Sequence, residues 1–190
     1  MKFRSKALLL ALCAVLLVAA TIFGTMAYLT ANTQTVTNTF TVSNITVELK
    51  ETTGTEYKMI PGYTISKDPT VKVVAGSEQC FLFVKLDKSE NFGTFLTYDM
   101  AEGWTALTGQ NGVYYREVPA ANTDTEFSVL KDNKVTVKSD VTKEKMNALK
   151  QDTYPTLKIT AYASQLYKDA TTKFEVAEAW ATVNPTTVTP

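Results

Sequence analysis

The sequence predicts an all-β protein: an antiparallel, jelly-roll-like β-sandwich with one or two short helices, preceded by a cleaved signal peptide. Three observations lead to this fold class. Short apolar stretches alternate with polar residues along most of the chain, as in strands with one buried face. Gly, Pro, Asn and Asp separate these stretches at short intervals, which is typical of all-β domains. The beginning of the chain is basic and then strongly apolar, as secretory leaders are.

Residues 1–27 have the three-part layout of a secretory signal peptide. A basic head precedes a continuous apolar run, and the small residues Thr25 and Ala27 stand at the −3 and −1 positions of a cut between Ala27 and Tyr28. Two alternatives stay open. The cut could follow Ala20 instead, and an apolar stretch of about 20 residues is also long enough to remain as a transmembrane anchor.

Cleavage after Ala27 leaves 163 of the 190 residues, enough for one domain with a sizeable core. We expect an extended strand segment over residues 28–44 and a β-sandwich domain over residues 45–190. The leader holds three of the 19 basic residues and none of the 19 acidic ones, so the mature chain has a net charge of −3. This charge argues against a nucleic-acid partner.

The residue types of the mature chain exclude several kinds of chemistry. The chain has no histidine, so it lacks the ligands of a usual zinc peptidase and the base of a Ser-His or Cys-His nucleophile pair. Cys80 is the single cysteine after the leader, because Cys13 belongs to the apolar run, so no internal disulfide can form. Export without disulfides fits a Gram-positive bacterium. We expect no catalytic residues, no cofactor and no metal.

The first mature residues form an uncharged, strand-prone segment. Val36, Phe40 and Val42 share one parity and therefore one face of an extended chain. The apolar residues that follow, Ile45 and Val47, have the opposite parity. This phase change predicts a bulge or short turn between two strand pieces, with a single kinked strand as the alternative.

The remaining elements follow in order. A Pro61-Gly62 turn precedes a strand through Val71 and Val73, and residues 80–86 form the most apolar stretch of the mature chain. We expect this stretch to be a central strand, buried on one face and partly covered on the other. Further strands are predicted within residues 95–104, 113–118 and 157–163, and a hairpin is predicted around Asp132-Asn133. A short helix is expected within residues 142–150. A second helix should begin at a Thr172–Glu175 capping box and carry Val176, Trp180 and Val183 on one face.

Several other side chains are candidates for a site, each with an ordinary structural explanation. The thiol of Cys80 is expected to be buried and inert. The aromatic residues Trp104, Tyr114 and Tyr115 would form a patch for a carbohydrate or partner, unless they belong to the core. No recognisable calcium loop surrounds the carboxylates, which we expect to be solvated: Asp99, Glu102, Asp124, Asp132 and Asp140.

Two groups of motifs in this order resemble the TasA/camelysin family of Gram-positive surface proteins. The first is a leader that ends Gly24-Thr25-Met26-Ala27, with Tyr28 after the cut and then Asn38-Thr39-Phe40-Thr41. The second is the Pro61-Gly62 turn, Lys67-Asp68-Pro69, Gly76-Ser77-Glu78 and the apolar strand from Cys80 to Leu86, with Trp180 near the C-terminus. Between residues 90 and 152 the likeness is limited to strand patterning.

The resemblance implies a secreted jelly-roll subunit of a cell-surface or biofilm-matrix fibre. In such a fibre the N-terminal segment of one subunit adds a strand to the next, so the partners are further copies, related matrix subunits and, during export, the signal peptidase. Here Val36, Phe40 and Val42 would be the side chains of that assembly strand. Part of the family has been called metallopeptidase, which the lack of histidine argues against.

Two other readings of the same sequence give different functions. In the first, the N-terminal strand folds back onto its own sandwich and nothing polymerises. In the second, the protein is a monomeric or membrane-anchored cell-surface binding module that uses a loop patch. A charged residue in place of Phe40 distinguishes the fibre from the binding module. It should stop polymerisation of a fibre subunit, whereas a binding module does not polymerise in the first place.

Overall fold

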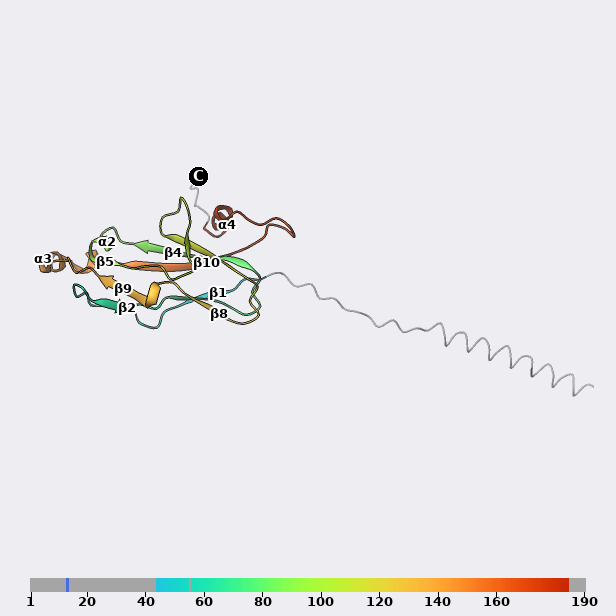
Figure 1. Cartoon of the computed structure of the whole chain (residues 1–190), viewed down its shortest axis with the longest axis horizontal. Coiled ribbons are helices and arrows are strands. Elements are labelled where there is room, and N and C mark those ends of the chain that lie inside the picture. The colour runs from blue at the N-terminus through green and yellow to red at the C-terminus, as the bar shows by residue number, and fades with distance from the viewer. Residues whose placement is uncertain (1–12, 14–43, 55, 185–190) are drawn as a thin grey trace, which may run out of the picture. The chain divides into compact units, whose positions relative to one another are not determined.

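The computed structural model describes residue 13, residues 44–54 and residues 56–184. The described strands and helices after residue 44 lie in one compact unit, Val42–Pro190 (Figure 1). The predicted signal peptide, the cleavage pair Ala27 and Tyr28, and the assembly-strand residues Val36, Phe40 and Val42 lie outside the described residues.

The unit is mostly β-structure, and all of its strand pairs are antiparallel, as the sequence predicts. Three sheets have the orders β1-β3-β8, β10-β4-β7-β6 and β2-β9-β5. Their strands are β1 Val47–Lys50, β2 Thr64–Ser66, β3 Thr70–Val73, β4 Cys80–Lys88, β5 Leu96–Thr97, β6 Thr105–Ala106, β7 Val113–Val118, β8 Thr125–Ser128, β9 Lys134–Val137 and β10 Leu157–Gln165. The helical segments are α2 Phe92–Phe95, η1 Lys131–Asn133, α3 Lys143–Asn147, η2 Gln151–Thr153 and α4 Val176–Val183.

Strand β4 is the centre of the fold. It pairs with β10 on one edge and β7 on the other, and its first five residues are all buried. Cys80, Leu82 and Val84 point into the main core, which they share with Val71 and Val73 of β3. The prediction of a central strand at residues 80–86 is therefore confirmed, and the strand continues to Lys88.

The two faces of β4 belong to two separate apolar clusters. Phe81 and Phe83 point away from the main core into the second cluster, which helix α4 covers. The indole of Trp180 on α4 lies 5.3 Å from the ring of Phe83 and 5.2 Å from the ring of Tyr162 on β10, in both cases measured between ring centroids. Figure 1 shows α4 on one side of the β4–β10 layer and strands β1, β2, β8 and β9 on the other.

Cover by α4 changes one expectation about β10. The alternation of apolar and polar residues in this strand predicts one solvent-exposed face, formed by Lys158, Thr160, Tyr162 and Ser164. Instead, Ser164 is buried, its hydroxyl lies 3.1 Å from that of Thr182 on α4, and Tyr162 packs against Trp180. Only the first part of this face is wet, because the helix covers the second part.

Three local predictions are corrected. Strands β8 and β9 do not form a hairpin, because β8 pairs with β3 while β9 pairs with β2 and β5 in another sheet. Asp132 and Asn133 have positive φ angles of 53° and 54° in the segment that connects the two sheets. Residues 95–104 contain only the two-residue strand β5, since α2 extends to Phe95.

The third correction concerns the start of the C-terminal helix. The capping box is made by Glu175 and Glu178, not by Thr172 and Glu175, and the backbone N–H of Glu175 donates to the Glu178 carboxylate at 3.2 Å. The N–H of Thr172 donates instead to Asp169 in the preceding turn, at 2.8 Å. The helix α3 prediction is confirmed, with Thr142 as its N-cap.

Replacing Trp180 with alanine is expected to destabilise the protein by about 3–5 kcal/mol, because a buried indole would leave a cavity between α4 and the β4–β10 layer. The measurement is equilibrium denaturation in urea. Tyr63, 58 % exposed, is the control, and its replacement with alanine should change the free energy of unfolding by less than about 0.5 kcal/mol. Similar effects of the two substitutions would contradict the packing role of α4.

Candidate functional site

The outer edge of β10 has no strand partner among the described residues, since β10 pairs with β4 alone. At one end of this pair the N–H of Ser89 donates to the carbonyl of Thr156, and at the other the N–H of Leu166 donates to the carbonyl of Gln79. Even-numbered residues of β10 therefore direct their backbone groups toward β4. The odd-numbered residues direct theirs outward, and these residues are Leu157, Ile159, Ala161, Ala163 and Gln165.

This edge is long, and Lys158 is the only charged residue in its strand. Proteins commonly protect such edges with proline, bulges or charges that point along the edge. Strand β10 spans nine residues without proline or glycine, in a regular register with β4. The edge strand of the neighbouring layer, β1, packs near β10 without pairing with it. One lateral side of the sandwich thus presents a row of backbone donors and acceptors.

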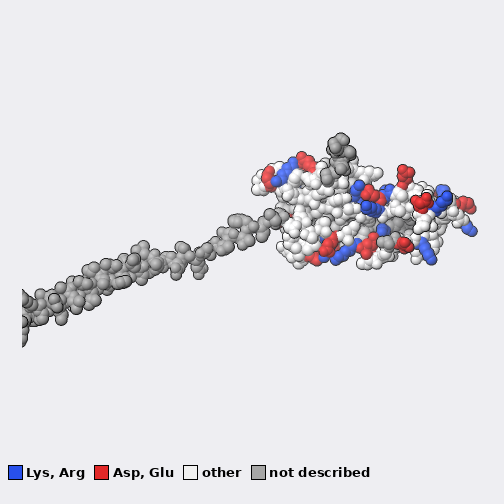
Figure 2. All heavy atoms as spheres, turned by 180° about the vertical axis from the view of Figure 1, so that it is seen from behind, with Lys and Arg blue, Asp and Glu red and all other residues white. Residues whose placement is uncertain are grey.

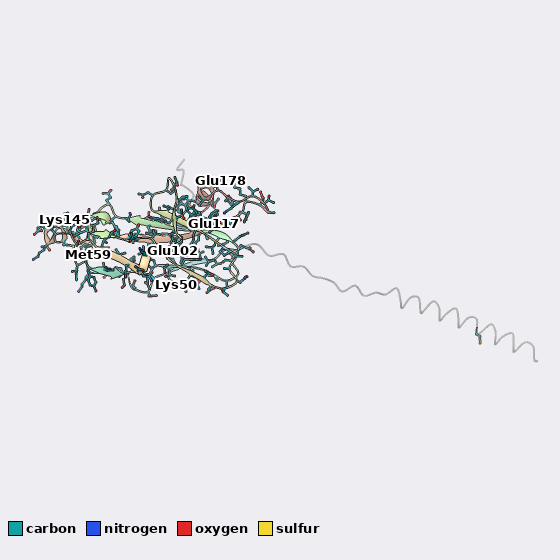
Figure 3. All side chains as sticks on the ribbon, viewed as in Figure 1. Lys50, Met59, Glu102, Glu117, Lys145 and Glu178 are labelled. Atoms are coloured by element: carbon teal, nitrogen blue, oxygen red, sulfur yellow. The ribbon has the colours of Figure 1, made fainter. Side chains whose placement is uncertain are left out.

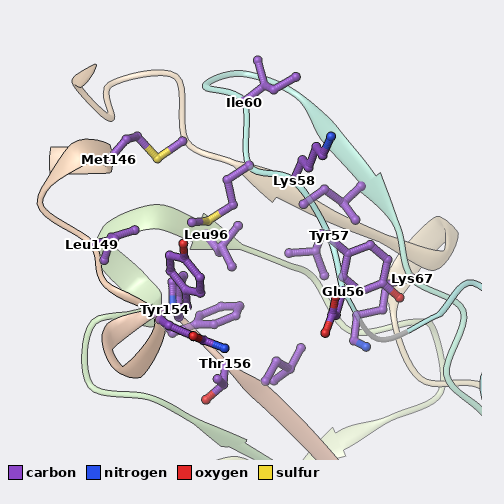
Figure 4. A pocket seen from close by; sticks show the side chains of 17 residues that line it. Glu56, Tyr57, Lys58, Ile60, Lys67, Leu96, Met146, Leu149, Tyr154 and Thr156 are labelled. Atoms are coloured by element: carbon purple, nitrogen blue, oxygen red, sulfur yellow. The ribbon is translucent and has the colours of Figure 1, made fainter. Parts of the chain in front are cut away.

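A groove of about 1030 Å³ adjoins the N-terminal end of this edge. Its floor is made of the core residues Ile65, Phe92, Leu96 and Val135, which come from four elements. One wall comes from residues 56–60 and the other from the α3–η2 region and the start of β10 (Figure 4). The wall residues are Glu56, Tyr57, Lys58, Met59, Ile60, Met146, Leu149, Gln151, Tyr154, Pro155, Thr156 and Leu157.

The rim of the groove is apolar and exposed. Ile60 is 57 % exposed and Tyr154 is 52 % exposed, although both are large hydrophobic side chains. The flexible thioethers of Met59 and Met146 are only partly buried against the core. Exposed apolar side chains gathered around a groove are typical of a surface that binds another chain.

The other end of the groove is polar and held in place by a hydrogen-bond network. The Nζ of Lys67 lies 2.6 Å from the Glu51 carboxylate, and the hydroxyl of Tyr57 donates to the same carboxylate at 2.9 Å. Desolvation by burial raises the pKa of Tyr57. This network anchors the segment that forms one wall of the groove.

Asp68 ties the loop after β1 to the start of β3. The hydroxyl of Thr52 donates to one carboxylate oxygen at 2.5 Å, and the backbone N–H groups of Thr52 and Thr53 donate to the other at 2.9 and 3.0 Å. The Thr52 hydroxyl and these backbone groups together hold the pKa of Asp68 far below its usual range. The Lys67-Asp68-Pro69 motif of the sequence is thus a structural clamp beside the groove.

Charged residues on the rest of the surface are mixed in sign. Figure 2 shows Lys and Arg interspersed with Asp and Glu on the face it displays. Lys72 lies 3.0 Å from Glu48 and 3.1 Å from Asp124, a pairing that raises the pKa of Lys72. Figure 3 shows Glu178 on α4 and Lys50 on β1 at opposite outer surfaces. Such alternation gives no strong electrostatic field of one sign over the face displayed.

The structure separates the aromatic residues that the sequence suggested as a patch. Trp104 and Tyr114 pack against the main core, whereas Tyr115 packs against the second cluster on the opposite face of the sheet. Asp124 pairs with Lys72 and accepts from the N–H of Ala75. Within the described residues, no group of three or more Cys, Asp or Glu side chains is placed to hold a metal ion.

The groove and the β10 edge were not predicted as a site. An apolar pair at Met59-Ile60 inside a polar segment, and Met146 and Leu149 beside it, were the signals available in the sequence. Neither pair indicates by itself that the two segments face each other across a groove. That arrangement depends on the sheet order, which places the start of β10 opposite residues 56–60.

Comparison with protein-family models, with curated proteins and with solved structures finds no match for this chain. Of the helices in the described part of the chain, none is long and apolar enough to span a membrane. The fold class that the structure defines is an antiparallel β-sandwich, in which the outer edge of β10 has no strand partner among the described residues. The TasA/camelysin resemblance stays a prediction from the sequence.

Cys80 is fully buried, and burial raises the pKa of its thiol to about 11. The unfolded thiol titrates near its ordinary value of 9.0, so between the two values the unfolded chain binds fewer protons than the folded one. Stability should therefore fall as pH rises, by roughly 2 kcal/mol between pH 8 and pH 11. Urea denaturation across this range measures the fall.

Cys80→Ala is the control for this prediction, since its unfolding free energy should lose this part of the pH dependence. Burial raises the pKa of Tyr98 from its ordinary value of 10.0 to about 12, so Tyr98 adds a further fall in stability above pH 10, and this part should remain in Cys80→Ala. A thiol reagent should react with native Cys80 only at the rate of unfolding. Fast reaction in the native state would contradict the assignment of Cys80 as an inert core residue.

Proposed function

We propose that this protein is a secreted structural subunit of a cell-surface or biofilm-matrix fibre, in which the N-terminal strand of one copy adds to the β10 edge of the next. The single observation that carries the proposal is the outer edge of β10, which has no strand partner among the described residues and has five residues whose backbone groups point outward. An added strand satisfies such groups by main-chain hydrogen bonds.

The donor in this proposal is the segment of residues 28–44. It is uncharged from residue 30 to residue 42 and contains no Pro or Gly in that range, so all its N–H groups are available for pairing. Alternate side chains Val36, Phe40 and Val42 would lie on one face of the added strand. The groove that adjoins β10 offers exposed apolar side chains to receive such a face.

The described part of the sandwich core begins after this segment. Among the described residues, both apolar clusters start at Ile45 or later, and the compact unit begins at Val42. A free donor segment and an acceptor edge on one subunit form a head-to-tail contact, which does not close on itself and so extends into a filament. In this proposal, removal of the leader before Tyr28 frees the donor segment, so the signal peptidase would control assembly.

The proposed function is structural and not enzymatic. The histidine-free sequence offers no usual zinc, Ser-His or Cys-His site. The buried Cys80 is unsuited to act as a nucleophile, because burial raises the pKa of its thiol. Nothing in the proposed assembly requires a cofactor.

The donor strand is tested by comparing purified residues 28–190 with a chain that begins at Asn44. Electron microscopy and light scattering should show filaments for the longer chain and folded monomers for the shorter one. Phe40→Asp should abolish filaments, because a charge would have to enter an apolar groove. Thr39→Asp, on the other face, is the matched control and should retain them. Folded monomers of both chain lengths would overturn self-assembly and favour a monomeric binding module.

The acceptor edge is tested by Ala161→Pro. The N–H of Ala161 points away from β4, so proline should leave the β4 pairing intact while removing a donor and blocking the edge. Ala161→Ser keeps the N–H and is the matched control. We expect the proline variant to remain folded, as judged by circular dichroism, and to lose filaments. Normal filaments from the folded proline variant would exclude β10 as the acceptor.

A further inference from the structure

Arg116 lies on the inner face of the sandwich at the side opposite the β10 edge. Its strand, β7, is separated from β10 by β4, and its register partner on β4 is Leu82. It is the only arginine within the described part of the chain. The strand β8 of the other layer and the segment before β6 meet at this side, so Arg116 stands between Phe127 and Trp104.

Aromatic rings and a glycine surround the guanidinium. Its central carbon lies 4.0 Å from the ring centroid of Phe127 and 5.4 Å from that of Trp104. The indole N–H of Trp104 donates to the Ser128 carbonyl at 2.9 Å, which fixes the orientation of that ring. A Cβ at Gly103 would be 2.7 Å from one amino nitrogen of Arg116, so the guanidinium occupies space that any other residue would fill.

This cation has no partner among the described residues. Arg116 forms no ion pair with them, and its enclosed Nε lacks a hydrogen-bond acceptor. The two terminal amino nitrogens are not among the enclosed atoms without a partner, and they donate no hydrogen bond to another described residue. Desolvation by burial lowers the pKa of the guanidinium, which means that its charge is poorly compensated. A partly buried arginine without a carboxylate is an incomplete ion pair.

We propose that Arg116 is the centre of an anion-binding site that takes the carboxylate of a uronic acid in an acidic polysaccharide. The two amino groups present parallel donors that match the two oxygens of a carboxylate. The half-buried indole of Trp104 lies beside them and offers a flat apolar surface. A uronic acid combines a carboxylate with an apolar sugar face on one rigid ring, whereas a glutamate side chain lacks the rigid ring. The site is independent of strand addition at β10.

The test uses the chain that begins at Asn44, which contains both apolar clusters and lacks the donor segment. Tri-galacturonate is titrated while NMR records the Nε–H of Arg116 and the indole N–H of Trp104, with neutral galactotriose as the control ligand. We expect both signals to shift with tri-galacturonate only. Added salt should weaken the binding, because an ion pair near the surface is screened.

Substitutions separate binding from folding. Arg116→Lys keeps the charge but loses the parallel donors, and should weaken binding by roughly tenfold. Gly103→Ala should displace the guanidinium, while Gly109→Ala is its matched control, because both glycines have positive φ but only Gly103 faces Arg116. Equal binding by wild type, Arg116→Lys and Gly103→Ala would overturn the proposal.

The ligand class is also open to contradiction. Absence of any shift with tri-galacturonate in the folded wild-type chain would show that Arg116 is only a stacked part of the core. Binding of an acetylated glutamate amide as strong as that of tri-galacturonate would assign the site to a protein carboxylate, and would overturn the polysaccharide assignment. Neither result bears on filament formation, so this test and that of the proposed function fail separately.

Discussion

Burial of β4 on both faces is the constraint on which the rest of the structure depends. A strand whose neighbouring side chains enter two different apolar clusters needs cover on each side and a paired strand on each edge. The sheet that contains β3 covers one face of β4, and helix α4 with Trp180 covers the other. Strands β10 and β7 then take the two edges, because the backbone groups of a buried strand must be hydrogen-bonded.

This arrangement determines where the two proposed binding sites lie. Since β10 satisfies one edge of β4, its own outer edge is left without a partner in the described residues. The groove beside Leu157 lies next to this edge, and apolar side chains remain exposed around it. On the opposite side, β7 brings Arg116 between Phe127 and Trp104, where its charge has no protein partner among the described residues. In our two proposals, one lateral side receives an added strand and the other receives an anion.

Local sequence signals were sufficient where a short segment decides its own structure. The alternation through residues 80–86, the turn at Pro61-Gly62 and the helix capped by Thr142 were predicted correctly. Local signals failed where the structure of a segment depends on its pairing with a strand far away in the sequence. The apolar alternation on either side of Asp132-Asn133 is compatible both with a hairpin and with two strands in different sheets. In the structure β8 and β9 pair in different sheets, and residues near the turn do not determine this pairing. The capping box of α4 was predicted one turn too early, because Thr172 and Glu175 are three residues apart and both are followed by a glutamate at the third position.

The sequence by itself determined the fold class, the central position of the strand at residues 80–86 and the lack of histidine chemistry, because periodicity and residue type follow directly from the order of the chain. The tertiary structure alone decided that both faces of β4 are buried and which residues form the groove. It also decided that, among the described residues, the outer edge of β10 has no strand partner and Arg116 has no ion-pair partner. These features depend on contacts between segments far apart in the chain, and a one-dimensional pattern specifies which faces are apolar but not which faces meet.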